Sequence, residues 1–117
     1  MTSIIQDAHA KASAAAALAA EKFLATHYGG QDAGPCGFAW VTYYPAFKGN
    51  TSDGRAERRT MEALGFRKDY TGKAWQLWNP SASYVQNVDS KYAGALEYAK
   101  VLEAESGIKV YAGDRLD

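Results

Sequence analysis

The chain has 117 residues, of which 47% are hydrophobic and 22% charged, and its thirteen basic and thirteen acidic side chains leave no formal net charge. This length and composition predict one self-sufficient globular domain, and the neutral balance excludes a surface that attracts polyanions over its whole area. The single cysteine, Cys36, excludes a disulfide framework and a CxxC zinc site, and we expect no metal and no cofactor. Without a membrane-length apolar run or the basic start of an export signal, the expected location is the cytoplasm.

A long alanine-rich helix is predicted over residues 1–28. Ser3 and Gln6 form a capping-box pattern at its start, and Gly29 follows its end. Its apolar stripe is narrow and consists mostly of small side chains, namely Ile5, Ala12, Ala16, Ala19 and Phe23. Such a stripe is expected to pack on something flat, either a sheet face or a second copy of the chain. Residues 29–36 are rich in glycine and are predicted to be a linker.

The remaining residues, 37–117, alternate between strand and helix patterns. A strand is predicted up to Tyr44, a helix from Ser52 or Asp53 to the residues before Gly65, and a hairpin of 66–70 and 73–78 around Thr71-Gly72. A third helix is predicted from Asp89 or Ser90 to Gly107, followed by a strand over 108–112.

This order predicts an α+β fold, a ferredoxin-like βαββαβ antiparallel sheet with an additional N-terminal alanine-rich helix. Strands 38–44 and 73–78 are expected to be adjacent and central. Both later helices should lie on one face of the sheet, and the alanine-rich helix is the natural candidate to cover part of the other.

Aromatic residues gather between Phe38 and Tyr84, where ten of them lie. If Ala39 and Val41 face the helices, strand alternation predicts the following open-face set: Phe38, Trp40, Thr42, Gln76, Trp78, Lys109 and Tyr111. Such a platform could stack nucleobases, or it could be a second core beneath the alanine-rich helix. The sequence leaves both interpretations open.

Positive charge is concentrated in residues 48–73, which hold seven basic and four acidic side chains. These basic residues could form a basic edge beside the aromatic platform, suited to one or a few phosphates: Lys48, Arg55, Arg58, Arg59, Arg67, Lys68 and Lys73. Arg58, Arg59 and Lys73 are the ones proposed to contact the ligand. The alternative is an ordinary solvated helix face in which Glu62 pairs with one of the arginines.

Cys36 lies in a Gly-Pro-Cys-Gly loop, where backbone amides can activate a thiol. A nucleophilic thiol also needs a base, and only His9 and His27 are available, both on the N-terminal helix. Catalysis therefore depends on how that helix docks, and we expect no catalytic residue.

Four segments resemble small proteins encoded by bacteriophages and prophage-like regions: CGFAWV at 36–41, WNPS at 78–81, the stretch 94–102, and the ending from Gly107-Ile108 through Tyr111 to Arg115-Leu116-Asp117. The resemblance covers about residues 34–117 and excludes the alanine-rich helix. It implies a small accessory protein that binds a host protein, a nucleic acid or a signalling nucleotide, and it supplies no catalytic residue.

Together these patterns predict a phage-type accessory protein that acts as a non-catalytic binding module for a host protein or a small phosphorylated ligand such as a nucleotide. The alternatives are a single-stranded nucleic-acid-binding protein that uses an aromatic sheet face, and a Cys36-dependent enzyme. We expect no membrane partner and no coating of duplex DNA, and self-association could occur through helix 1–28. The candidate ligand-binding residues are Phe38, Trp40, Trp78, Tyr111, Arg58, Arg59 and Lys73.

Overall fold

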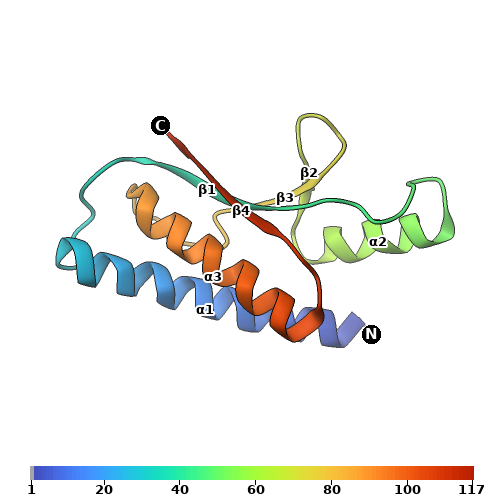
Figure 1. The fold of residues 1–117 in the computed structure, drawn as a ribbon, viewed down its shortest axis with the longest axis horizontal. Helices are drawn as coiled ribbons and strands as arrows, with labels where there is room; N and C mark the ends of the chain where they lie inside the picture. The colour runs from blue at the N-terminus through green and yellow to red at the C-terminus, as the bar shows by residue number, and fades with distance from the viewer. Residues whose placement is uncertain (1) are drawn as a thin grey trace.

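The structure is a computed structural model that describes residues 2–117, with side chains from Ile4 onward. It confirms an α+β fold, in which three helices accompany one four-stranded antiparallel sheet (Figure 1). In chain order the elements are α1 (Thr2–Tyr28), β1 (Gly37–Tyr43), α2 (Ser52–Ala63), β2 (Arg67–Lys68), β3 (Trp75–Trp78), α3 (Val88–Ser106) and β4 (Tyr111–Leu116). No helix among these residues has the length and apolar character needed to cross a bilayer.

The sheet has the strand order β2-β3-β1-β4, so β1 and β3 are its central, adjacent strands, as predicted. Every neighbouring pair is antiparallel, with Trp40 opposite Trp78 across β1 and β3, and Trp40 opposite Gly113 across β1 and β4. The last strand lies later in the chain than the predicted 108–112, because Gly107 ends α3 in a left-handed conformation and the chain first pairs with β1 at Tyr111.

The hairpin between β2 and β3 is confirmed, although its strands are shorter than predicted. Asp69 accounts for this, because its carboxylate accepts hydrogen bonds from the Thr71 hydroxyl at 2.7 Å and the Thr71 amide at 3.1 Å. The hydrogen bond from Thr71 lowers the pKa of Asp69. Residues on both sides of Gly72 therefore belong to the turn and not to the strands, and Gly72 itself takes a positive φ of 74°.

Both later helices begin earlier than predicted. Thr51 caps α2 by accepting from the Gly54 amide at 3.0 Å, and Asn87 caps α3 by accepting from the Ser90 amide at 2.7 Å. The predicted caps, Ser52 or Asp53 and Asp89 or Ser90, lie inside the helices instead. The predicted cap of α1, Ser3, lies outside the residues whose side chains are described.

One hydrophobic core joins all three helices to one face of the sheet. Met61 of α2 and Tyr98 of α3 belong to the same buried cluster as Val41 of β1, so both later helices cover the same face. Glu57 fastens α2 to the end of β1, because its carboxylate accepts from the Tyr43 hydroxyl at 2.6 Å and from the Ala46 amide at 2.8 Å. Burial raises the pKa of Tyr43, so this hydroxyl stays a donor.

The alanine-rich helix does not cover the other sheet face, which corrects the prediction. Figure 1 shows α1 alongside α3, and the α1 alanines join the same core as Val41. The buried stripe also differs from the predicted one, because Ala8, Ala20 and Leu24 are buried whereas Ile5, Ala19 and Phe23 are only partly buried. The full buried stripe is Ala8, Ala12, Ala16, Ala20 and Leu24, a four-residue repeat that forms a straight ridge.

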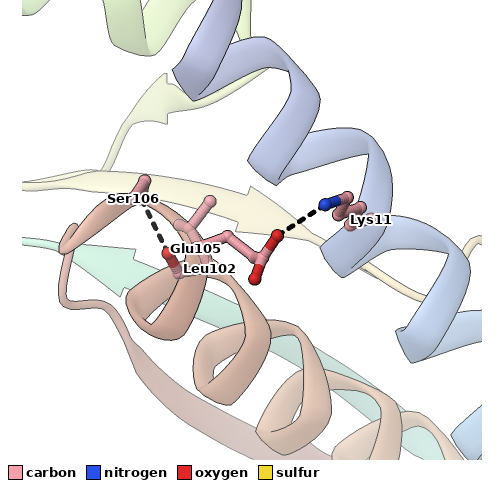
Figure 2. A network of polar contacts seen from close by, with 4 residues as sticks. All are labelled: Lys11, Leu102, Glu105 and Ser106. Carbon is pink, nitrogen blue, oxygen red and sulfur yellow. Dashed lines mark hydrogen bonds and ion pairs between the residues drawn. The ribbon is translucent and has the colours of Figure 1, made fainter.

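The close approach of α1 to α3 depends on Gly94. A β-carbon there would lie 2.7 Å from the Ser81 Cβ, in the loop after β3, and 3.0 Å from the Ala16 carbonyl oxygen of α1, so a larger residue would have to displace both neighbours. At the end of α3, Lys11 and Glu105 form a 2.7 Å ion pair beside the Ser106 hydroxyl, which donates to the Leu102 carbonyl (Figure 2). This exposed pair adds little stability, so packing of small residues holds α1 in place.

His9 makes a partly buried polar contact within this interface. Its Nδ1 lies 2.7 Å from the hydroxyl of Tyr98, which is fully buried. Burial lowers the pKa of His9 below its ordinary value and raises that of Tyr98, so at neutral pH a neutral imidazole is hydrogen-bonded to a protonated phenol, and the imidazole tautomer sets which of the two donates.

We predict that Gly94→Ala lowers the free energy of unfolding by about 1–3 kcal/mol, because the added methyl overpacks the contacts of α3 with Ser81 and with α1. Gly49→Ala is the matched control, since a β-carbon at that exposed position meets nothing within 4 Å. Urea unfolding followed by circular dichroism measures both. Equal stability of the two variants would contradict the close packing at Gly94.

Stability should also fall as the pH drops from about 7.5 to 5, since the folded state holds a lowered pKa at His9 and binds fewer protons than the unfolded chain in this range. The loss is small, because His9 is only half-buried and solvent screens it. His9→Gln should flatten the pH dependence, whereas the same change at the exposed His27 should preserve it. Parallel slopes for the two variants would contradict a role for His9.

Candidate binding face

The register of the strands identifies which side chains point away from the helices. Ala39 and Val41 are buried in the core, so the alternate positions of β1 and their cross-strand partners lie on the opposite side. We call this side the open face, and its strand residues are Phe38, Trp40, Thr42, Arg67, Gln76, Trp78, Tyr111, Gly113 and Arg115. The predicted aromatic residues therefore do lie on one face, and α1 does not cover them.

Trp40 and Trp78 form the centre of the open face. Their ring centroids lie 4.9 Å apart with planes tilted by 37°, and Phe38 meets Trp78 edge-on at 6.0 Å. Trp78 keeps 47% of its surface exposed, whereas Trp75, which points the other way on the same strand, keeps 4%. The alternation of β3 thus divides its two tryptophans between solvent and core.

Gly113 lets the indole of Trp40 lie close to the sheet. A β-carbon at Gly113 would come within 2.8 Å of the Trp40 Nε1 atom, so a larger residue would displace the ring. Tyr111, two residues earlier on β4, is half exposed and pairs with Tyr44 at a centroid distance of 5.8 Å. The result is an aromatic surface that extends along β1 from Phe38 toward Tyr44.

Two cations flank the Phe38 end of this surface. The Arg115 guanidinium carbon lies 5.7 Å from the Phe38 ring centroid, and the Lys91 ammonium lies 5.9 Å from it. Lys91 reaches this position from α3 and donates to the Gly37 carbonyl at 3.1 Å. The open-face strand residues include two arginines, Arg67 and Arg115, and no carboxylate, so the face favours an anionic ligand.

Of the basic edge predicted from the sequence, Arg67 lies on the open face, but the three cations proposed to contact the ligand are located elsewhere. Arg58 and Arg59 belong to α2, which packs on the opposite side of the sheet, and Arg58 lies 3.8 Å from Glu62. Lys73 lies in the loop between β2 and β3. The structure therefore assembles four of the seven predicted site residues, namely Phe38, Trp40, Trp78 and Tyr111, and supplies its charge from Lys91 and Arg115 instead.

A shallow pocket of about 290 Å³ adjoins the Phe38 end of the open face. Its lining includes Phe38, Lys91, the exposed Tyr84 and the carboxylate-bearing Asp117. Asp32, in the loop between α1 and β1, fixes the segment that follows Tyr84, because its carboxylate accepts hydrogen bonds from the amides of Gln86 and Asn87 at 2.9–3.1 Å. These hydrogen bonds hold this wall of the pocket in place.

Cys36 lines the same pocket, and its thiol is free and exposed. No histidine is among the pocket's described lining residues, and His9 is hydrogen-bonded to Tyr98 in the helix interface. The Cys–His arrangement that an enzyme would need is thus not formed within residues 2–117. Groups of three or more metal-ligating side chains are also missing from this range.

Sequence reasoning missed Lys91 and Arg115. Arg115 follows the predicted end of the last strand, and only the register that places it opposite Phe38 reveals its position. Lys91 lies in the first turn of α3, and a basic residue at a helix start gives no indication in the sequence that it reaches a sheet face. No family model, curated protein or solved structure matches this chain.

Proposed function

We propose that this chain is a non-catalytic binding module whose open face holds a small phosphorylated ligand with an aromatic base, that is, a nucleotide. The observation that carries the proposal is the exposed Trp78 packed against the half-buried Trp40 beside Arg115 and Lys91, on a face without strand carboxylates. Indole rings supply stacking energy of about 1–3 kcal/mol per base, independently of which base is bound.

The arrangement gives each part of a nucleotide a separate place. A base would stack on the exposed surface of Trp78, and its phosphates would extend toward the guanidinium of Arg115 and the ammonium of Lys91. The adjoining pocket offers room at that end, and Asp117 in its lining limits how many phosphates fit comfortably. A short ligand with one or a few phosphates suits this geometry better than a long strand.

The proposal includes a ferredoxin-like arrangement of the strands and helices that follow α1. It is supported by the order strand, helix, strand, strand, helix, strand after α1, and by the antiparallel pairing of β1 with β3 and β4. The departure from a bare ferredoxin-like unit is α1, which adds a helix on the already covered face. In this proposal the extra helix serves stability and leaves the open face available.

We further propose that the chain is a phage-type accessory protein that acts in the host cytoplasm. It rests on the short motifs that resemble phage-encoded proteins, two of which, CGFAWV and WNPS, run through β1 and the end of β3. These motifs therefore contribute Phe38, Trp40 and Trp78 to the open face. A host protein that docks on the same aromatic surface is the competing occupant.

The test is a fluorescence titration with ATP, AMP, adenosine and ribose 5-phosphate, together with a dT hexamer. We expect ATP and AMP to bind more tightly than either fragment, because only they engage both the indoles and the cations. Trp78→Ala should weaken ATP binding by roughly tenfold or more. Arg115→Gln should weaken it several-fold and make it less sensitive to salt.

Arg58→Gln is the matched control, because Arg58 lies on the helical side of the sheet and should not affect affinity. Near-ultraviolet circular dichroism checks that each variant keeps its fold. An absence of saturable binding by every probe at millimolar concentration would refute the proposal and favour a protein partner. Equal losses for Arg58→Gln and Arg115→Gln would also refute it, since binding would then not localise to the open face.

A further inference from the structure

The two edges of the sheet differ in length. The strand order places β2 at one edge and β4 at the other, and β2 has two residues whereas β4 has six. A free strand of this length presents a row of backbone amides and carbonyls that can pair with another strand. The β4 edge is therefore the surface most suited to adding a strand.

The hydrogen bonding of β4 to β1 shows which of its backbone groups face outward. The Asp117 amide donates to the Cys36 carbonyl at 3.0 Å, and in an antiparallel pair the inward and outward residues alternate. The odd-numbered residues of β4 thus bond to β1. The amides and carbonyls of Ala112, Asp114 and Leu116 point away from the sheet.

We propose that β4 pairs with β4 of a second copy of this chain, antiparallel and centred on Gly113. A two-fold axis normal to the sheet places the open faces of both copies on the same side. Each open-face side chain therefore lies opposite an open-face side chain of the second copy. In this register Tyr111 lies opposite Arg115 of the second copy, and Lys109 lies opposite its Asp117. Ala112 and Asp114 exchange the hydrogen bonds.

Charge complementarity selects this register. The two-fold axis makes each favourable pair occur twice, so the interface gains two Lys–Asp pairs and two contacts between an arginine and a tyrosine ring. These pairs fall at the positions without cross-strand hydrogen bonds, where side chains approach most closely. Lys109 is free to turn toward the interface, because its present partner, Glu103, is a loose contact at 3.8 Å between exposed side chains.

The neighbouring registers are unfavourable. Centring on Asp114 places the two Asp114 carboxylates directly opposite each other, and centring on Ala112 places Lys109 opposite Arg115 twice. Like charges directly opposite across strands are destabilising. Centring on Gly113 leaves the two Asp114 side chains diagonal, each opposite a small alanine.

The dimer would form one eight-stranded sheet with both aromatic surfaces on the same side. α1 lies on the helical side of the sheet, because its alanines share the core with Val41 and Ile5 lines a pocket with Met61 and Ile108, so α1 is not paired with the β4 edge. A second copy of the chain therefore matches both the length and the charges of the free β4 edge.

Sedimentation equilibrium of the full chain without ligand tests the proposal. We expect a dimer, and Ala112→Pro should reduce it to a monomer while keeping the fold, because the missing amide faces solvent in the single chain. Lys109→Glu should weaken the dimer by about tenfold, since it places the new carboxylate opposite Asp117 of the other copy, and the two-fold axis makes this repulsive pair occur twice. The double variant Lys109→Glu with Asp117→Lys should restore it.

Lys100→Glu is the matched control, because it reverses the same charge at an exposed position of α3 and should leave the dimer intact. Leu18→Glu on the exposed side of α1 should likewise have no effect. A wild-type chain that stays monomeric at roughly millimolar concentration would overturn the proposal. A dimer that survives Ala112→Pro, or that is lost with Leu18→Glu, would overturn it as well.

Discussion

The contact between α1 and Gly94 of α3 decides what the rest of the molecule presents to solvent. With glycine at this position, α1 approaches until the Ala16 carbonyl lies against the α3 backbone. The alanine ridge of α1 then becomes part of the single core that covers one face of the sheet. Because α1 is fully engaged there, it leaves the opposite face of the sheet without a covering helix.

The exposed aromatic surface follows from that arrangement. Burying Trp78 and Tyr111 under a helix would satisfy their apolar rings, yet each keeps about half of its surface exposed. Large contiguous apolar surface on a monomer indicates a binding site. The cations around Phe38 and the absence of strand carboxylates on this face favour an anionic partner, which is why a nucleotide is the proposed ligand.

Strand alternation allowed much of the open face to be predicted. Ala39 and Val41 have small or branched side chains typical of a core, so Phe38 and Trp40 had to point the other way. The positions of the helix caps were harder to predict, because several residues near each helix start are good caps and Thr51 and Asn87 were overlooked. The placement of α1 was predicted wrongly because an alanine stripe does not specify its partner, and the glycine that accepts it lies almost eighty residues away in α3.

The charged part of the site could not be predicted for a related reason. Arg58 and Arg59 are adjacent in the sequence, but α2, which carries them, packs through Met61 on the helical side of the sheet. Arg115 is isolated in the sequence, and it gains meaning only from the register that sets it opposite Phe38. Local composition therefore identified the type of side chain required but not the residues that supply it.

The accessibility of the three indole N–H groups tests the central claim, that the open face is bare, most directly. Nuclear magnetic resonance with a soluble paramagnetic agent reports it for each tryptophan separately. The structure predicts strong broadening of the Trp78 indole signal and no broadening of Trp75, which is buried among the core residues. Equal protection of Trp78 and Trp75 would show that α1 or another segment covers the face, and would contradict the account.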